Sequence, residues 1–350
     1  MTNTSQFESF TEQVGTVAFA TFLVGISIIG AFANIVVIVS IVANDSLRTK
    51  TNYVVLSLAM SDFLGATVGI PLRLLEHVSS SNRTLVSCNI VLALTLLFDG
   101  VSRLNIVLIS FDRFMAVKYP FTYAKLSSQK ATLIAITSFW TVMVAFAICI
   151  LSGVGLRDEV TGEDKETADM LISYGKKSWH ICFLSSTLSK AAVLTFTFGI
   201  GAFPIIIVAP INVYLIKTSF WHIRRIQDLH TSLEANSNLH GADGKYENNR
   251  GRQRRPVTTQ RHGKRAKMVA ILVCLYLVLV APISVIDIVE TLTNISVPSY
   301  VSKTALILIY LNTAVNMFVY AAFNREFREA FIRIFVKMFR NRCRQFQMSF

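Results

Sequence analysis

The charged residues with the clearest chemical meaning lie inside one apolar stretch, residues 88–119. Asp99 and Arg103 occur in its middle, and the sequence Asp112-Arg113-Phe114 occurs near its end. A charged side chain at the centre of a membrane-spanning helix costs on the order of 2.5–3.5 kcal/mol on insertion scales, so such a residue marks a functional site or a buried pair. Because Asp99 and Arg103 are four residues apart, they have the spacing of an ion pair within one helix.

A second isolated acid, Asp62, lies in the apolar stretch 52–76. A buried carboxylate without a partner either takes up a proton or requires a cation. Asp62 is therefore a candidate cation site, and a neutral polar cluster is the alternative interpretation.

Seven apolar stretches supply the helices that must surround these charges. Hydrophobic residues make up 53% of the 350 residues and charged residues 16%, which is too apolar for a soluble globule of this size. A spanning helix needs about 20 residues to cross a hydrocarbon core about 30 Å thick. Suitable uncharged runs and two stretches with interior charges are, in order, 13–44, 52–76, 88–114, 131–156, 191–216, 268–286 and 304–324.

The predicted fold is an all-α membrane protein, a seven-transmembrane helix bundle followed by an amphipathic cytoplasmic helix. We expect residues 1–14 to form an extracellular tail and residues 15–322 the bundle, with a partly disordered cytoplasmic loop at 218–263. Residues 323–350 are expected to form the amphipathic helix and a short tail. Phe327, Phe331 and Phe335 recur every four residues there, which is typical of a helix lying on a membrane face.

Lysine and arginine gather in the segments after the first, third and fifth spans and in the C-terminal tail. Such residues mark cytoplasmic segments, so the N-terminus is expected outside the cell and the plasma membrane is the expected location. The net charge of +13 then belongs to a cytoplasmic face and not to a nucleic-acid-binding surface. Glycosylation sequons at Asn3, Asn82 and Asn294 fall in outer segments and agree with this orientation.

Three cysteines have predicted roles. Cys88 heads the third span and Cys182 lies in the second outer loop, an oxidising environment, so a disulfide between them is expected. Cys343 lies in a basic and aromatic tail and is a palmitoylation candidate, with an unmodified thiol as the equal alternative.

Motifs spread in order along all seven spans resemble those of the rhodopsin-like (class A) G-protein-coupled receptors. They are Asn34, Leu58-Ala-Met-Ser-Asp62, Cys88 with Cys182, Asp112-Arg113-Phe114, Trp140, Pro204, Pro282 and Asn316-Met-Phe-Val-Tyr320. Within that family the chain is similar to the amine receptors, and nearest to the histamine receptors, at 53–63, 70–72, 105–110, 266–272, 281–282 and 330–335.

The resemblance implies a ligand site that departs from the amine pattern. The aspartate that anchors the amine in that family is replaced here by Thr95, and a glutamate of the nearest relatives is replaced by Ile200, whereas Tyr310 matches. Asp99 lies one turn inward from Thr95, about 6 Å deeper at 1.5 Å per residue, and is one candidate anchor. The ion pair with Arg103 is the favoured alternative for Asp99, and Asp287 with its neighbour Glu290 offers other cation contacts.

The resemblance also implies partners for Asp62 and a second site at the inner end of the third span. The family's partners of Asp62 correspond to Ser102, Asn312 and Asn316, which implies an allosteric Na⁺ site and no other cofactor. Asp112, Arg113, Phe114 and Tyr320 correspond to the family's coupling residues, which implies a heterotrimeric G protein and arrestin as partners beside the lipid bilayer.

The resemblance implies a receptor that binds a small extracellular ligand, a biogenic amine or a related small molecule, and activates a G protein. Val280 and Met317 replace a tryptophan and a proline of the family, which leaves two alternatives open: a receptor for a non-amine ligand, and a divergent seven-helix protein that no longer couples. The sequence contains no HExxH motif, P-loop or metal-spaced Cys/His cluster, so an enzyme is not expected. A transporter would be expected to have internal repeats with broken helices, and the sequence shows no such repeat.

Overall fold

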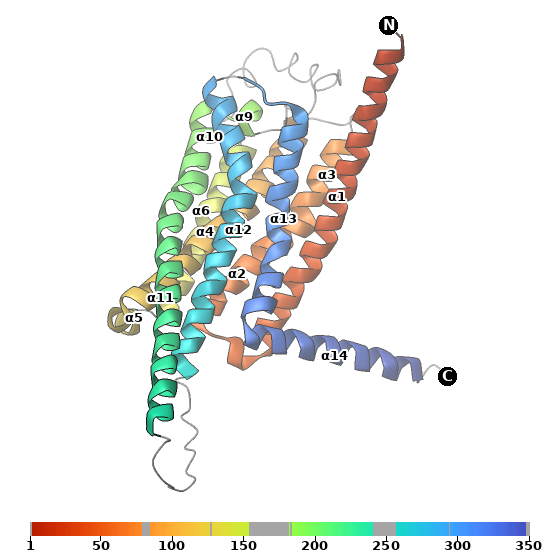
Figure 1. Ribbon diagram of the computed structural model, residues 1–350. Coiled ribbons are helices and arrows are strands. Elements are labelled where there is room, and N and C mark those ends of the chain that lie inside the picture. Colours follow the sequence, from red (N-terminus) through yellow and green to blue (C-terminus); the bar gives the residue numbers. More distant parts are fainter. Residues whose placement is uncertain are drawn as a thin grey trace.

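The computed structural model describes residues 2–78, 85–126, 128–153, 182, 184–240, 257–293 and 295–347. Seven helices in these ranges are long and apolar enough to cross a membrane, as predicted. They run side by side as one bundle, with the two termini at opposite ends (Figure 1). The spans are formed by α1 (Thr2–Ala43), α2 (Lys50–Leu64) with α3 (Ile70–Val78), α4 (Leu85–Lys118), α6 (Gln129–Leu151), α10 (Lys190–Phe196) with α11 (Phe203–His240), α12 (Val257–Thr293) and α13 (Ser299–Phe323).

Two spans are interrupted by π-helical turns, each just before a proline. Gly65–Gly69 joins α2 to α3 ahead of Pro71, and Thr197–Ala202 joins α10 to α11 ahead of Pro204. A proline has no N–H to donate to the preceding turn and its ring crowds that turn, so the helix widens there.

Three helices are longer than the sequence indicates. Helix α1 begins at Thr2 and not near residue 15, so the expected extracellular tail 1–14 is helical from Thr2 onward. The predicted cytoplasmic loop 218–263 is shortened from both sides, because α11 ends at His240 and α12 begins at Val257. Residues 2–14 and 218–240 contain neither glycine nor proline, so nothing in them ends a helix that has already formed.

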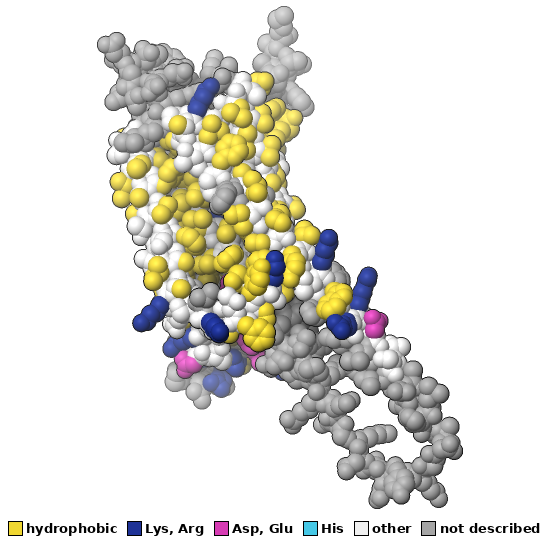
Figure 2. Space-filling model, turned by 90° about the vertical axis from the view of Figure 1, so that its left-hand side faces the viewer, with side chains coloured by type: hydrophobic (Ala, Val, Ile, Leu, Met, Phe, Trp, Pro, Cys, Tyr) yellow, Lys and Arg dark blue, Asp and Glu magenta, His cyan; other side chains and the backbone are white. Residues whose placement is uncertain are grey.

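The flanks of the bundle are apolar, as a lipid-facing surface requires. Large side chains such as Phe22, Ile28, Ile134 and Val278 are exposed there. Figure 2 shows the apolar side chains along one flank and most Lys and Arg side chains toward the lower end, where α14 lies in Figure 1. This separation agrees with the predicted cytoplasmic side.

Polar side chains inside the bundle bond between helices. Asn34 on α1 donates its amide to the carbonyl of Thr313 on α13 at 2.7 Å. The hydroxyl of Ser57 on α2 accepts hydrogen bonds from Asn105 on α4 and Trp140 on α6, both at 3.1 Å. These bonds satisfy buried polar groups that lipid cannot.

Helix α14 (Arg325–Gln347) extends sideways from the base of the bundle, crosswise to α13 (Figure 1). Phe327 and Phe331 are buried against the bundle, and the Phe327 ring stacks on Tyr320 with 5.3 Å between ring centroids. On its exposed face, the Arg325 guanidinium lies 2.6 Å from Glu329 and holds the pKa of that carboxyl below its ordinary value. The predicted amphipathic helix is therefore present.

Candidate functional site

A cavity of about 90 Å³ lies in the outer half of the bundle. Helices α2, α3, α4, α10, α12 and α13 line it, together with the π-helical turn Gly65–Gly69, Cys182 and Leu184. Its charged lining residues are Asp62, Arg73, Asp99, Arg103 and Asp287. Such a concentration of charge within an apolar bundle requires that most of these groups have partners.

Asp99 and Arg103 form the ion pair that their spacing indicates. Arg103 Nη2 lies 2.6 Å from Asp99 Oδ2, and the arginine side chain is only 4% exposed against 21% for the aspartate. Arg103 Nη1 also reaches Ser284 Oγ on α12 at 3.5 Å, the outer limit of a hydrogen bond. The pair therefore neutralises two membrane charges within α4 and places a cation against α12.

Arg73 on α3 contacts the residue pair that forms the disulfide near the head of α4. Its Nη1 lies 3.4 Å from Glu76 and donates to the carbonyl of Cys182 at 3.0 Å. Cys182 is disulfide-bonded to Cys88 at the head of α4, as predicted, with the two Cα atoms 5.4 Å apart. Both side chains of the Arg73–Glu76 pair are buried. The contact depends on the backbone of Cys182, which no sequence pattern reports.

Asp287 on α12 is the other acid in the outer cavity. Asp287 is 8% exposed, and its Oδ1 has no hydrogen-bond partner among the described residues. Glu290, one turn further out, is already engaged: one oxygen accepts from Ser185 Oγ at 2.6 Å and the other from the N–H of Val297 at 2.9 Å. Glu290 therefore bonds to neighbouring segments of the chain, whereas Asp287 has an oxygen without a described partner.

The remaining predicted ligand residues are placed unevenly. Thr95 and Tyr310 line the cavity, but the Thr95 hydroxyl donates to the Val91 carbonyl of its own helix at 2.6 Å. Ile200 is not among the lining residues and packs instead against the apolar cluster around Phe196. Ile200 lies in the π-helical turn Thr197–Ala202. The extra residue in that turn rotates the side chains relative to a regular helix, so the position of Ile200 in the sequence does not place it in the cavity.

The deep end of the cavity contains the predicted sodium residues. Asn316 donates its amide to Asp62 Oδ2 at 2.6 Å, and Asn312 lines the same space. Asp62 Oδ1 and Ser102 Oγ are buried without a partner among the described residues. Oxygen atoms left over in this way fit a hard cation such as Na⁺, which prefers carboxylate, hydroxyl and amide oxygens.

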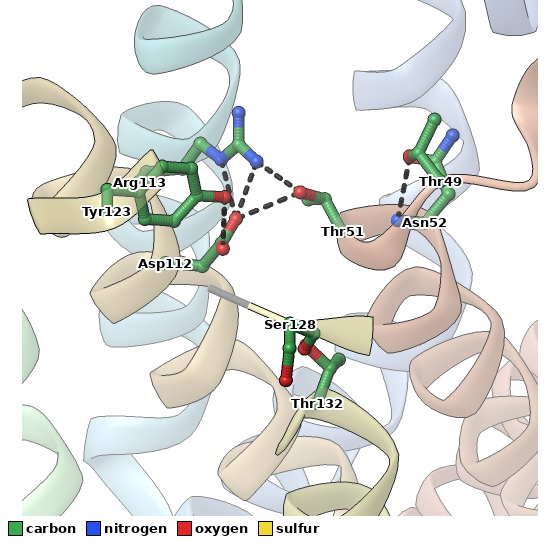
Figure 3. Close-up of polar contacts among 8 residues, drawn as sticks. All are labelled: Thr49, Thr51, Asn52, Asp112, Arg113, Tyr123, Ser128 and Thr132. Carbon is green, nitrogen blue, oxygen red and sulfur yellow. Dashed lines mark hydrogen bonds and ion pairs between the residues drawn. The ribbon is translucent and has the colours of Figure 1, made fainter. Parts of the chain in front are cut away.

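Arg113, near the inner end of α4, is held in a closed polar network (Figure 3). Its guanidinium donates to Asp112 Oδ2 at 2.5 and 3.1 Å and also to the hydroxyl of Thr51 on α2. The same Asp112 carboxylate accepts from Thr51 at 2.9 Å and from Tyr123 on α5 (Pro120–Leu126) at 2.7 Å. Lys50 packs over the Tyr123 ring, 4.2 Å from its centroid.

A second cavity of about 250 Å³ opens beside this network. Arg113, Tyr123 and Tyr320 line it with residues of α2, α12 and α14. Phe114 faces another way and packs edge-on against Tyr214 of α11, with 5.6 Å between ring centroids. Three of the four predicted coupling residues therefore meet around one inner region, and Phe114 joins α4 to α11.

Some predicted modification sites lie outside the described part of the chain. Asn82 and Asn294 fall outside the described residues, and the side chains of Asn3 and Cys343 are not described. The glycosylation and palmitoylation assignments therefore stay predictions.

Comparison with known proteins places this architecture in a family. The chain is 33% identical to dopamine receptor 3 of Caenorhabditis elegans over 156 residues, which are 44% of this chain and only 26% of that receptor. It is 23% identical to adenosine receptor A2b of Gallus gallus over 322 residues, covering 89% of this chain and 86% of the relative. It is 25% identical to the allatostatin-A receptor of Bombyx mori over 343 residues, covering 95% and 83%.

These relatives include an amine receptor, as the motifs indicate, while the finer similarity to histamine receptors stays a prediction. The family model described as 7 transmembrane receptor (rhodopsin family) matches residues 33–320, which is most of the chain. The matched range contains the lining residues of both cavities except Asn324 and the two residues of α14. The chain therefore belongs to the rhodopsin family of seven-transmembrane receptors.

Proposed function

We propose that this chain is a plasma-membrane receptor that binds a small ligand in the outer cavity and activates a heterotrimeric G protein at the inner one. The observation that carries this proposal is the placement of both sites on α4. Asp99 and Arg103 line the outer cavity, and Arg113 lines the inner cavity ten residues further along the same helix.

Helix α12 completes the path between the two cavities. Ser284 on α12 contacts Arg103 near the outer site, and Met268 and Leu272 of the same helix line the inner cavity. A ligand that contacts α4 and α12 shifts the populations of two states only if it binds them unequally. In the signalling state the inner end of α12 swings outward and widens the inner cavity.

The network around Arg113 describes the resting state in this proposal. While Asp112 and Thr51 occupy the guanidinium, it is not available to a partner. Release of these bonds turns Arg113 toward the widened cavity, where the C-terminal helix of a G protein docks in the manner of a helix in a groove. Arrestin is expected to use the same opening.

In this proposal Asp62 is the centre of an allosteric Na⁺ site, and occupation of that site would favour the resting state. Asp62, Ser102 and the two amides of Asn312 and Asn316 would hold the ion, which supplies a positive charge to a buried carboxylate. The ion's effect is allosteric.

The ligand is proposed to be a biogenic amine or a related small molecule entering from the side of the disulfide. The named relatives are receptors for dopamine, adenosine and allatostatin-A, so a non-amine ligand is the second candidate. The presence of Asp287 without a partner in the described part of the cavity favours a cationic ligand over a neutral one.

The test is second-messenger output, cAMP and calcium, in cells that express the full chain. Wild type and Arg113→Ala are compared at matched surface expression, without ligand and with dopamine, histamine and adenosine. Basal or ligand-dependent output that disappears in Arg113→Ala supports the proposal. Equal output from both variants and from untransfected cells would leave the non-coupling alternative.

A further inference from the structure

We propose that Asp287 is the anchor of the ligand's cationic group, and that the ligand is a small organic monocation. The inference rests on the proposed function, because it names the ligand class of that outer cavity. It removes the anchoring role from the third span, where Asp99 would have supplied it.

Among the described residues, the charged side chains that line the cavity have ion-pair partners except at two places. Arg103 is paired with Asp99, and Arg73 is paired with Glu76. The cavity's remaining acids are Asp62, at the deep sodium end, and Asp287, at the outer end. Since a buried carboxylate without a counter-charge is costly, each of these two places favours one added positive charge.

Asp287 is built to receive that charge from a ligand. Its residue is more than nine-tenths buried, it lines the cavity, and its Oδ1 has no partner among the described residues. Arg103, Asp99 and Glu290 influence the carboxylate electrostatically, but no described side chain forms an ion pair with it. A ligand ammonium placed here would gain both an ion pair and a hydrogen bond.

Asp99 is the poorer anchor for a physical reason. A ligand ammonium at Asp99 would meet a carboxylate that Arg103, whose side chain is 4% exposed, already neutralises. If the ligand drew that carboxylate away, the guanidinium would be left with Ser284 at 3.5 Å and the ring of Phe196 at 5.8 Å. A buried cation with so few contacts is far more costly than the pair it leaves.

The same pairing argues against an acidic group on the ligand. A ligand carboxylate would have to draw Arg73 from Glu76 and the Cys182 carbonyl, or Arg103 from Asp99. Either exchange breaks one ion pair to make another. The cavity therefore selects monocations over zwitterions and anions of the same shape.

The first test needs no ligand. The thermal unfolding midpoint of the purified full-length receptor in lipid nanodiscs is compared for wild type, Asp287→Asn and Asp287→Glu. Because Asp287 has no ion-pair partner among the described residues, Asp287→Asn is expected to leave the midpoint unchanged or raise it. A variant that unfolds at a clearly lower temperature, or fails to fold, means that the carboxylate has a partner inside the protein and overturns the proposal.

The second test uses four probes of one shape and different charge: 2-phenylethylamine, 2-phenylethanol, 3-phenylpropanoate and phenylalanine. Titration of each probe against the unfolding midpoint reports its binding, because a ligand of the folded state raises the midpoint. The amine is expected to bind best, and Asp287→Asn to weaken it by about 10- to 100-fold, the loss of one hydrogen-bonded charge. Asp287→Glu retains the preference for the amine.

Glu290→Gln is the matched control, since it removes an acid one turn away whose oxygens are already bonded. It is expected to leave the amine preference intact. Equal binding of the amine by wild type and Asp287→Asn, a loss confined to Glu290→Gln, or a preference for phenylalanine overturns the proposal. Binding is measured without a G protein, so a failure here is distinct from a failure of Arg113-dependent signalling.

Discussion

Removing the carboxylate of Asp99 should destabilise the receptor more than removing the whole ion pair. In Asp99→Asn, the Arg103 guanidinium keeps only the long contact with Ser284 and the ring of Phe196. Breaking a buried pair by removing one partner costs about 3–5 kcal/mol. The carboxylate side is 21% exposed, which lets cavity water reach the cation, so we expect the lower end, about 3 kcal/mol.

The reciprocal change is expected to cost less. Arg103→Met leaves Asp99 at the cavity wall, where water can solvate it, and we expect a loss of about 1–2 kcal/mol. The double variant replaces both charges by neutral groups of similar volume, which is often neutral in stability, so it should lie within about 1 kcal/mol of wild type. The predicted coupling between the two positions is therefore about 3 kcal/mol or more.

The assay is SDS-induced unfolding of the purified receptor in mixed micelles, read as a double-mutant cycle. The exposed pair Arg325 and Glu329 on α14 has the same spacing, four residues, and serves as the matched control. It should show no measurable coupling, because exposed pairs are screened by water. If the losses in Asp99→Asn and Arg103→Met simply add in the double variant, the inference that the pair is held in a low-dielectric interior is wrong.

Three further predictions follow from other contacts. Thr51→Val and Tyr123→Phe each remove a hydrogen bond to the Asp112 carboxylate or the Arg113 guanidinium, worth about 1.5–3 kcal/mol. Basal cAMP or calcium output should therefore shift by about tenfold or more, and unchanged basal output at matched surface expression contradicts this. Asp62→Asn should abolish the rise of the unfolding midpoint in NaCl over KCl, and a salt difference equal to that of wild type would exclude the sodium site. Phe327→Ala should cost about 3–5 kcal/mol because the ring is buried against Tyr320, whereas Phe335→Ala, at a half-buried position, should cost clearly less in the same SDS titration.

Much of the fold could be predicted because hydrophobic run length and charge placement act locally along the chain. Each span had to be long enough to satisfy its own backbone bonds in lipid, and that requirement is visible in the sequence. The extents of α1, α11 and α12 could not be predicted in the same way, because polarity alone does not end a helix. Ser57, which joins three helices, gave no signal because its partners lie far away in sequence.

The candidate site was predictable where spacing within one helix decides the contact. The pair of Asp99 and Arg103 is an example, since four residues along a helix place them on one face. Ile200 shows the limit, because the π-helical turn rotates it away from the cavity. Two other features depend on how separate segments pack. They are the hydrogen bond from Arg73 to the Cys182 carbonyl and the lack of a described partner for Asp287.

The central claim is that ligand-side charges and Arg113 belong to one signalling unit, and nucleotide exchange on purified G proteins tests it most directly. Full-length receptor in nanodiscs is mixed with each class of heterotrimer, and GTPγS binding is followed for wild type, Arg113→Ala and Tyr123→Phe. The account predicts that at least one heterotrimer exchanges faster with wild type than with Arg113→Ala, and faster still with Tyr123→Phe. Identical exchange rates for all three receptors on every heterotrimer would contradict it.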